Sequence, residues 1–467
     1  MLLVGYIRMN KILEKIFGYR GYRIIIPLID LAVIYGSYIL AFYLFKDALD
    51  NFTLNYNAFK ASAPFIIISY LILSHIFELD KPKDFTLFGV GYTVVLAVGS
   101  LLFTTMAISF FIREFAFPRS ILLAGTIFQL VVITFWHLFA SRMYFRVNKG
   151  KSVLVIGYEK SQALAYKLLE SRGMWSQIKH VCSPAYPKVY ELIDECDITF
   201  ITEDVEESLK QEIILYCVEN DHTVLYQPKN LEILQFNANF LQIDDSPVLD
   251  VREFGLSQGS ETTKRIIDVL LGIIALVIFF IPFVFVYLAL KIGGGTAFYV
   301  QERITRDNKV FKIYKFRTMV ENAEAISGPV LAQDVDKRIT RLGHILRATR
   351  LDEIPQIFNI LIGDMSIVGP RPERPFFVKQ FCEEMPEYSL RHRVKAGLTG
   401  LAQVQGKYNT SVRDKLKYDL LYINGYSLAL DVKLIMQTLN ILLRSNSTEG
   451  VKSVEELGDE IERLTRR

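Results

Sequence analysis

The chain has 467 residues, of which 51% are apolar, with a mean hydropathy of +0.26 and a formal net charge of +3. This composition is too apolar for an ordinary soluble protein. The near balance of basic and acidic residues gives no reason to expect a nucleic-acid partner. The four cysteines are scattered without a Cys-x-x-Cys pair, so neither a disulfide framework nor a zinc site is predicted, and a reducing compartment is indicated.

Four apolar runs open the chain, each near the roughly 20 residues that a helix needs to cross a bilayer; they cover about 24–45, 64–77, 87–112 and 120–140. Basic residues precede the first run and follow the fourth, namely Arg8, Lys11, Lys15, Arg20, Arg23, Arg142, Arg146, Lys149 and Lys151. Lys81 and Lys83 also lie between the second and third runs. Because basic loops stay in the cytoplasm, residues 1–150 are predicted to form a four-helix transmembrane bundle that starts and finishes there.

One acid, Asp30, lies inside the first apolar run. An ionisable residue in a membrane segment indicates a functional site by default. The alternative is an acid near Tyr35 and Tyr38 that is hydrogen-bonded inside the bundle.

Residues 151–253 change character, because short apolar strands at 152–157, 198–202 and 223–226 alternate with helical patterns. That alternation predicts a parallel sheet with crossover helices. Gly157 ends the first strand, but the next residues are Tyr-Glu-Lys-Ser-Gln-Ala, without the second and third glycines of the dinucleotide fingerprint. We therefore predict a Rossmann-like domain without a cofactor, with a structural or regulatory role.

A fifth apolar run, 269–290, follows Lys264-Arg-Ile-Ile-Asp268 and is closed by Lys291. A full crossing would leave a basic set outside, namely Arg303, Arg306, Lys309, Lys312, Lys315 and Arg317. Pro282 removes a helix hydrogen bond past the middle of the run and permits a bend. We predict a re-entrant segment over about 266–291, two helices separated by a break at Pro282, that enters and leaves at the cytoplasmic face; a kinked fifth span is the alternative.

The remainder of 254–467 is predicted to be a small α+β domain. Strands are expected at 297–303 and 310–319 around an Arg306-Asp-Asn turn, followed by an acidic loop at 321–336. An apolar helix is expected at 428–443, and a solvated helix after the capping box that begins at Ser453.

The stretch 347–356 reads Arg-Ala-Thr-Arg-Leu-Asp-Glu-Ile-Pro-Gln, and a rigid turn at 369–373 reads Gly-Pro-Arg-Pro-Glu. Pro355 favours the first turn of a helix, so Asp352 and Glu353 are expected at a helix start, where free N–H groups favour a phosphate. Carboxylates for attack or for a metal, with arginines for phosphate oxygens, indicate phosphoryl transfer. Taken alone, the same residues fit a surface helix start with i,i+4 ion pairs better.

Further motifs surround this stretch in a fixed order: Lys264-Arg265-x-x-Asp268, Gln301-Glu302-Arg303, Tyr314-Lys315-Phe-Arg317-Thr-Met, Asp336-x-Arg338-Ile-Thr-x-x-Gly343, Leu346-Arg347, Leu351-Asp352-Glu353-x-Pro355-Gln356, Asn359, Gly363-Asp-Met-Ser-x-Val-Gly-Pro-Arg371-Pro-Glu373, Gly397-x-Thr-Gly400, Tyr418-Asp419 and Asp431. Together they resemble the bacterial sugar transferase family, the monotopic polyprenyl-phosphate phosphoglycosyl transferases. With four spans and a Rossmann-like domain ahead of it, the layout is similar to the long form that initiates exopolysaccharide, O-antigen or capsule synthesis. Ile281-Pro282, Gly295-Thr296 and Ala396-Gly397 depart from the family's Ser-Pro, Gly-Pro and Pro-Gly.

The resemblance implies that a UDP-sugar gives its sugar-1-phosphate to undecaprenyl phosphate, with release of UMP, through a covalent phosphosugar-enzyme. Asp352 would be the nucleophile and Glu353 would help to hold Mg²⁺. The phosphate-binding candidates are Lys315, Arg317, Arg347 and Arg371, and Asp431 would orient one of these four. The expected location is the bacterial inner membrane, in contact with lipid and with the catalytic domain on the cytoplasmic face; a homodimer is a further hypothesis.

Two other functions are alternatives to sugar-phosphate transfer. A membrane-anchored nucleotide-sugar dehydratase or epimerase would need the glycines that are missing after Gly157, and a Tyr-x-x-x-Lys pair in that domain. A non-catalytic scaffold for polysaccharide assembly would leave the acids with a structural role only.

Overall fold

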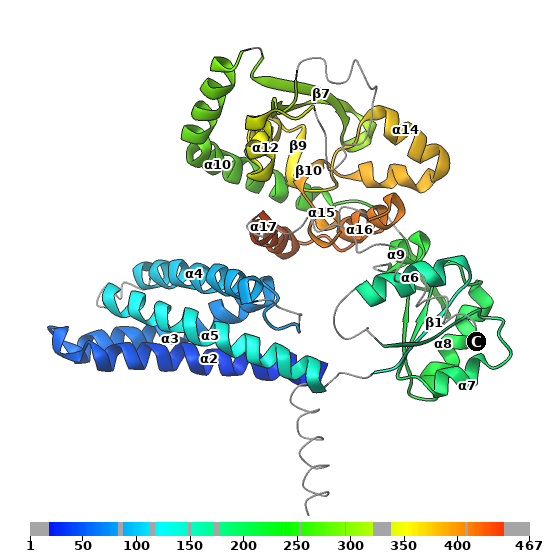
Figure 1. The fold of residues 1–467 in the computed structure, drawn as a ribbon, viewed down its shortest axis with the longest axis horizontal. Helices are drawn as coiled ribbons and strands as arrows, with labels where there is room; N and C mark the ends of the chain where they lie inside the picture. Colours follow the sequence, from blue (N-terminus) through cyan, green and yellow to red (C-terminus); the bar gives the residue numbers. More distant parts are fainter. Residues whose placement is uncertain are drawn as a thin grey trace, which may run out of the picture. The chain divides into compact units, whose positions relative to one another are not determined.

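The computed structural model describes residues 18–82, 87–111, 117–147, 151–170, 177–236, 238–251, 254–294, 296–320, 338–406 and 410–442. The chain divides into two compact units, Met1–Pro228 with Gly450–Arg467, and Lys229–Glu449 (Figure 1). Several predictions lie outside the described residues: the acidic loop at 321–336, the tail helix after Ser453, and the basic residues Arg8, Lys11, Lys15, Lys83 and Lys149.

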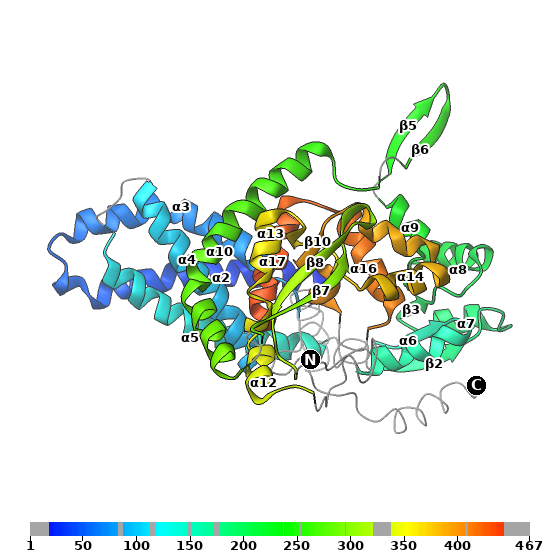
Figure 2. The same ribbon diagram turned by 90° about the horizontal axis from the view of Figure 1, so that it is seen from above.

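In the first unit, the four N-terminal apolar runs form helices long and apolar enough to cross a membrane. They are α2 (Tyr19–Leu44), α3 (Phe52–Ile76), α4 (Leu87–Phe111) and α5 (Arg119–Val147), and α2 packs on α5, α3 on α4, and α4 on α5 (Figure 2). The second helix starts earlier than predicted, because Pro64 lies inside it and Asn51 caps its start by accepting a hydrogen bond from the Leu54 N–H (3.1 Å).

The acid in the first apolar run is hydrogen-bonded inside this group of helices. Asp30 is fully buried, and its Oδ2 accepts from the Tyr70 hydroxyl (2.6 Å) and lies 3.0 Å from His137 Nε2. These contacts join α2 to α3 and α5. The structure shows the hydrogen-bonded alternative, with Tyr70 and His137 as the partners in place of the nearby Tyr35 and Tyr38.

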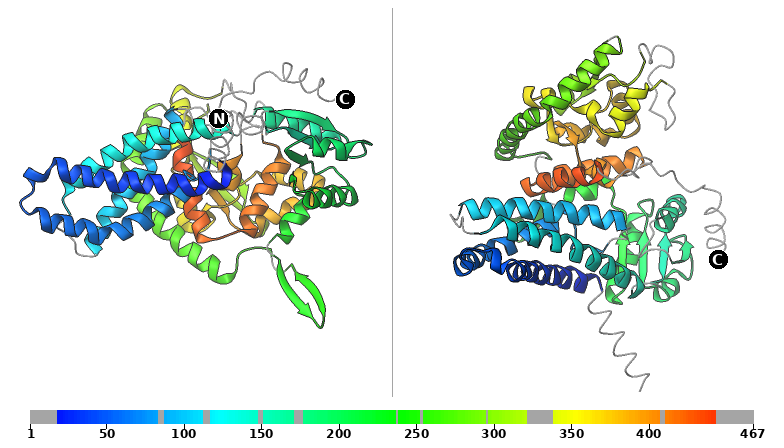
Figure 3. Two further views of the ribbon diagram at one scale, coloured as in Figure 1. Left: turned by 90° about the horizontal axis from the view of Figure 1, so that it is seen from below. Right: turned by 60° about the vertical axis from the view of Figure 1, so that its left-hand side comes forward.

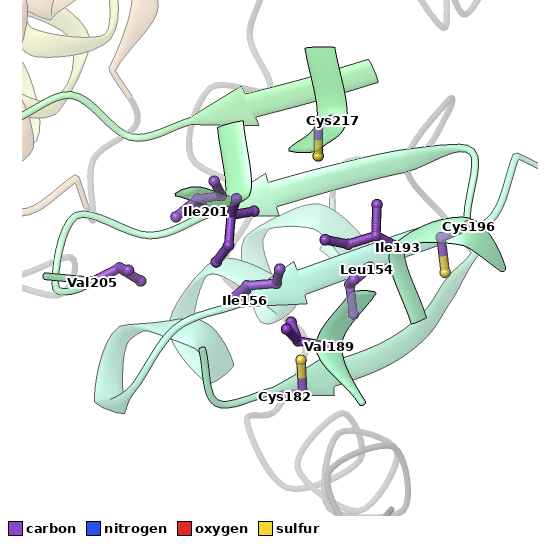
Figure 4. Packing of buried hydrophobic residues seen from close by; sticks show 10 residues of the cluster. Leu154, Ile156, Cys182, Val189, Ile193, Cys196, Ile201, Val205 and Cys217 are labelled. Carbon is purple, nitrogen blue, oxygen red and sulfur yellow. The ribbon is translucent and has the colours of Figure 1, made fainter. Parts of the chain in front are cut away.

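The second half of the first unit is a four-stranded parallel sheet of order β2-β1-β3-β4. Its elements are β1 (Val153–Ile156), α6 (Glu159–Glu170), β2 (Ile178–Cys182), α7 (Val189–Asp194), β3 (Ile198–Ile201), α8 (Glu207–Glu219) and β4 (Thr223–Tyr226). Figure 4 shows one side of the core, where buried aliphatic side chains pack with Cys182, Cys196 and Cys217, all free thiols. The sequence did not predict β2, whose polar Lys179 and His180 interrupt its apolar pattern.

The strand order of this sheet reverses between β1 and β3, and ligands of open α/β sheets bind at the carboxyl ends of such strands. Here the Asp204 carboxylate accepts a hydrogen bond from the Lys160 backbone N–H near the start of α6 (2.9 Å), and the Lys160 ammonium pairs with Glu203. The chain's own acids thus lie where a pyrophosphate would need donors, which opposes dinucleotide binding there.

The second unit begins with α9 (Asn230–Gln235) and a two-stranded antiparallel ribbon, β5 (Asn239–Ile243) and β6 (Ser246–Asp250), visible in Figure 2. The helix α9 packs on α16 (Val412–Asn424), and the Asn424 side chain donates to the Ile233 carbonyl (2.5 Å). The contact boundary between the units therefore lies at 228/229, whereas the composition of the sequence changes near 253.

The apolar run around Pro282 forms one helix, α10 (Gln258–Ile292), which is long and apolar enough to cross a membrane. Its helical hydrogen bonding continues past Pro282, so the structure has a single helix and not two helices separated by a break. Figures 1 and 3 show that this helix bends along its length. We assign the bend to Pro282, because a proline inside a helix removes one i→i−4 hydrogen bond.

The rest of the second unit packs around two short sheets, the antiparallel β7–β8 hairpin and the parallel β9–β10 pair. The elements are β7 (Phe298–Ile304), β8 (Val310–Phe316), α12 (Arg341–Ala348), η3 (Leu351–Glu353), α13 (Gln356–Ile362), β9 (Met365–Val368), α14 (Pro375–Glu384), η4 (Pro386–Arg393), β10 (Ala396–Thr399), α15 (Leu401–Gln405) and α17 (Leu428–Leu442). The predicted turn between β7 and β8 is present, and Asp307 and Asn308 both take a left-handed conformation in it (φ 57°).

Three residues in the first half of α10 hold it against this domain. Arg265 donates to the carbonyls of Ile360 and Leu361 in the last turn of α13 (2.6 and 2.7 Å). Asp268 accepts from the Ser366 hydroxyl (3.0 Å) and from the next backbone N–H (2.9 Å). Gly272 permits close approach of the two helices, since a Cβ there would lie 2.9 Å from the Leu361 side chain.

Candidate active site

The two adjacent acids of the central motif lie in η3, the single turn that precedes α13. Arg350 before them has a left-handed backbone (φ 56°), which turns the chain sharply after α12. Pro355 directly precedes the first residue of α13, as predicted from its fixed φ. Asp352 and Glu353 therefore lie on a tight turn between two helices, with Asp352 only 9% exposed.

Within the part of the chain that the structure describes, Asp352 has a carboxylate oxygen without a hydrogen-bond partner. Its Oδ1 is buried and has no hydrogen-bond partner among the described residues. Burial, and then the neighbouring charge of Glu353, raise the pKa of Asp352 above its ordinary value, although Lys315, Arg350 and Arg347 oppose them. A buried, unpartnered carboxylate oxygen of raised basicity can act as a nucleophile or as a metal ligand.

Glu353 carries a carboxylate that is already neutralised. Its Oε1 accepts from the Lys315 ammonium (2.9 Å) and from the Arg371 guanidinium (3.2 Å). Burial acts to raise the pKa of Glu353, but Lys315 and Arg371 outweigh it and hold the pKa well below its usual range. The two adjacent acids thus differ in environment, one paired and one open.

Lys315 reaches Glu353 because β8 is fixed against α13. The side chain of Asn359, fully buried, accepts from the Tyr314 N–H (3.0 Å) and donates to the Lys312 carbonyl (2.8 Å). Burial lowers the pKa of Lys315, and Glu353 offsets part of that effect. Asn359 thereby sets the strand that presents the lysine to the carboxylate.

Arg371 belongs to the rigid turn 369–373, whose backbone is held from three sides. Four hydrogen bonds fix it: Gly369 N–H to the Thr399 carbonyl (2.8 Å), Gly397 N–H to the Pro370 carbonyl (2.9 Å), the Arg391 guanidinium to the Arg371 carbonyl (2.8 Å) and Ile304 N–H to the Glu373 carbonyl (3.0 Å). A Cβ on Gly397 would lie 2.1 Å from the Gly369 nitrogen, so only glycine permits this approach. The arginine therefore projects from a backbone with little freedom to move.

The other two predicted phosphate-binding residues, Arg347 and Arg317, contact neighbours other than the two acids. Arg347 acts electrostatically on Asp352, and its Nε donates to the Thr318 hydroxyl (2.9 Å). Arg317 follows β8, and its guanidinium donates to the Gly294 carbonyl just beyond α10.

Asp431 has partners other than those predicted. Its carboxylate pairs with Lys264 of α10 and accepts from the Tyr422 hydroxyl (2.8 Å). It therefore anchors α10 to α17, and its contacts do not support the predicted role of orienting one of the four phosphate-binding bases. Pro282 lies in α10 and has no part in the polar site.

Two features of the site were not recognised in the sequence. Asn359 and Asp419 appear in the motif series, but no pattern showed that Asn359 bridges β8 to α13, or that Asp419 pairs with Arg391 (2.7 Å). An amide or a carboxylate among apolar neighbours in a helix indicates a buried polar contact, and this was the sequence signal that could have identified both residues.

Few side chains at this site could act as metal ligands. No group of three or more His, Cys, Asp or Glu that could hold a metal ion occurs within the described ranges. Mg²⁺, however, commonly takes only one or two carboxylates and completes its shell with water and substrate phosphates. The unpartnered Oδ1 of Asp352 and the neighbouring carboxylate of Glu353 fit an ion of that kind.

Comparison with known proteins relates this chain to the bacterial sugar transferases. The sequence pattern of the bacterial sugar transferases matches residues 259–445. The chain is 41% identical over 184 residues to a UDP-N-acetylgalactosamine-undecaprenyl-phosphate N-acetylgalactosaminephosphotransferase of Aeromonas hydrophila (38% of this chain, 43% of the relative). It is 35% identical over 225 residues to a UDP-glucose:undecaprenyl-phosphate glucose-1-phosphate transferase of Klebsiella pneumoniae (46% and 48%).

A shorter relative is matched over most of its length. The chain is 43% identical over 149 residues to a Bacillus subtilis protein provisionally named an undecaprenyl-phosphate N-acetylgalactosaminyl 1-phosphate transferase, covering 31% of this chain and 82% of that relative. The match to the two longer relatives spans about half of their length.

Proposed function

We propose that this chain, which belongs to the bacterial sugar transferase family, transfers sugar-1-phosphate from a UDP-sugar to undecaprenyl phosphate and releases UMP. The observation that carries the proposal is the pair of unlike acids in η3. Asp352 presents a buried carboxylate oxygen without a partner, beside a Glu353 that Lys315 and Arg371 neutralise. The names of the relatives, which specify sugar phosphotransferases acting on undecaprenyl phosphate, support it.

In the first step, a carboxylate oxygen of Asp352 attacks the phosphorus that bears the sugar. The bond from that phosphorus to the bridging oxygen breaks, and UMP leaves with the bond's electron pair. A phosphosugar is then joined to Asp352 as an acyl phosphate. In the second step, a phosphate oxygen of undecaprenyl phosphate attacks the same phosphorus, which returns the carboxylate and yields the lipid-linked diphosphate sugar.

The attack brings an anionic carboxylate to an anionic pyrophosphate, so the surrounding cations decide its rate. Lys315, Arg371 and Arg347 are held near the acids by contacts within the protein. Fixed cations of this kind stabilise developing charge without reorganisation. Asp352 and Glu353 would hold Mg²⁺, which when bound neutralises pyrophosphate oxygens.

In this proposal, α10 lies in the lipid and keeps the chemistry at a membrane surface. Its first half is held on α13, whereas Val277, Ile281 and Phe285 are 72–78% exposed. Such side chains are suited to lipid, and a proline-bent helix can enter and leave on one face. A re-entrant α10 at the cytoplasmic face lets a lipid phosphate and a soluble nucleotide sugar reach the same acids. A role in exopolysaccharide, O-antigen or capsule synthesis is proposed because the relatives are named as sugar phosphotransferases that act on undecaprenyl phosphate.

The test is UMP release from the purified full chain in lipid nanodiscs containing undecaprenyl phosphate and Mg²⁺, across a panel of UDP-sugars. We expect release with at least one donor, and none above background for Asp352→Asn. Asp364→Asn, a change of the same type on an acid outside η3, serves as the matched control. Full activity of Asp352→Asn would refute the mechanism, and no release by the wild type with any donor would favour the scaffold reading.

A further inference from the structure

A buried ion pair lies behind the turn that carries Arg371. Arg391 of η4 is 5% exposed and Asp419 of α16 is 2% exposed, and their charged groups are 2.7 Å apart. The Arg391 guanidinium also donates to the Tyr388 hydroxyl (2.6 Å) and to the Arg371 carbonyl (2.8 Å). One guanidinium therefore connects α16, η4 and the turn of the candidate active site.

The contacts form a single path from this pair to the reacting acids. Asp419 holds Arg391, which holds the carbonyl of Arg371, and the side chain of that same Arg371 donates to Glu353 (3.2 Å). Glu353 is adjacent in sequence to Asp352, the open carboxylate. A displacement of the Arg391 guanidinium therefore shifts the Arg371 backbone, and with it the Arg371 side chain that contacts Glu353.

We propose that Asp419 and Arg391 are positioning residues for the transfer reaction, which hold the Arg371 backbone so that its guanidinium stays on Glu353. The inference rests on the proposed function. Neither residue is placed in contact with substrate, and both act through Arg371. The guanidinium of Arg391 suits this role, because its Nη2 lies 2.7 Å from the Asp419 carboxylate and also donates to the Arg371 carbonyl, while its Nη1 donates to the Tyr388 hydroxyl.

The electrostatics of the pair agree with this role. Burial raises the pKa of Asp419 to about 6, and Arg391 opposes that rise. Other charged or titratable groups that interact with the pair are Glu373, Lys415, Tyr388, His392 and Cys382. The Asp419 carboxylate is costly to ionise in this buried position, and Arg391 stabilises its charged form. A buried ion pair of this kind suits a positioning role better than a solvent-exposed pair does.

The test is a double-mutant cycle on UMP release by the full chain in nanodiscs, with Asp419→Asn and Arg371→Lys as the two changes. We expect Asp419→Asn alone to lower kcat on the order of 10- to 100-fold, the loss that a misplacement near 1 Å produces. In the Arg371→Lys background, the same change should have almost no further effect, because the contact through which it acts is already lost. Glu387→Gln changes an acid of η4 that accepts from Asn230 (2.8 Å); it is the matched control and should keep wild-type kcat.

A merely structural role predicts losses that multiply in the two backgrounds, and this result, or wild-type kcat in Asp419→Asn, would overturn the inference. If Asp419→Asn does not fold, Tyr388→Phe takes its place in the cycle, since it removes one hydroxyl contact of Arg391 and keeps the ring. It should give a smaller loss that again disappears with Arg371→Lys, and equal losses in both backgrounds would overturn the inference. Failure of the proposed function would appear in the wild type, whereas failure of this inference would appear only in the variants.

Discussion

Replacing Lys315 with methionine leaves the Glu353 carboxylate in place with one cation where there were two. The lysine and glutamate side chains are 20% and 13% exposed, and their charged atoms are 2.9 Å apart. Removing one partner of a buried ion pair costs about 3–5 kcal/mol. Because Arg371 remains 3.2 Å from the same oxygen, we expect the lower limit, about 3 kcal/mol. For a unit of this size, that corresponds to a fall in unfolding temperature of about 6–12 °C.

The assay is thermal unfolding of the full chain in detergent, with Lys312→Met as control, an exposed lysine on the same strand. The decisive sample is the double variant Lys315→Met/Glu353→Gln. Removing the charge from the acid as well should restore stability, because much of the loss comes from the unpaired carboxylate. The electrostatic account of this pair is wrong if the unfolding temperature of the double variant is no higher than that of Lys315→Met. It is also wrong if Lys312→Met lowers the unfolding temperature as much as Lys315→Met does.

Three further predictions follow from other parts of the second unit. Asn359→Ala should lower the free energy of unfolding by about 1–3 kcal/mol, measured by the same unfolding assay, because it leaves the Tyr314 N–H and the Lys312 carbonyl without their partner. Since burial raises the folded pKa of Asp419 to about 6, from an ordinary value near 3.8, its contribution to stability is full below pH 3.8 and lost as the pH rises through 6. The unfolding temperature of Asp419→Asn should accordingly rise relative to wild type between pH 4.5 and 7, by the equivalent of up to about 3 kcal/mol, and an unchanged difference would contradict this. Chelation of Mg²⁺ with EDTA should stop UMP release, and added Mg²⁺ should restore it; release that is unaffected by EDTA would contradict a role for the ion.

Much of the site could be predicted because its central residues lie in short, ordered motifs. Proline limits the backbone enough for a local pattern to indicate a turn. Arg371 lies between two prolines, and Asp352 and Glu353 precede Pro355 by three and two positions. Their proximity to Lys315 was expected from the series of motifs, and the structure brings these four together. The apolar runs were equally readable, because a membrane helix needs only length and hydropathy.

The partners that hold the site could not be read in the same way. The contacts of Arg391 with Arg371, and of Asn359 with β8, join residues that are 20 and 45 positions apart, and only packing decides such pairs. Asp431 illustrates the same limit, since it lies near the start of its helix and yet binds Lys264, which is 167 positions away. In α10, the sequence predicted an interruption at Pro282. The structure instead has one helix that bends and continues, and this helix packs on α13.

The covalent step at Asp352 is the central claim, and intact-protein mass spectrometry tests it most directly. Incubation of the purified full chain with its UDP-sugar and Mg²⁺, in the absence of undecaprenyl phosphate, should add the mass of one sugar phosphate to the protein. The modified peptide should contain Asp352, and addition of undecaprenyl phosphate should remove the added mass. An adduct on another residue, or full UMP release by Asp352→Asn without any adduct, would contradict the account.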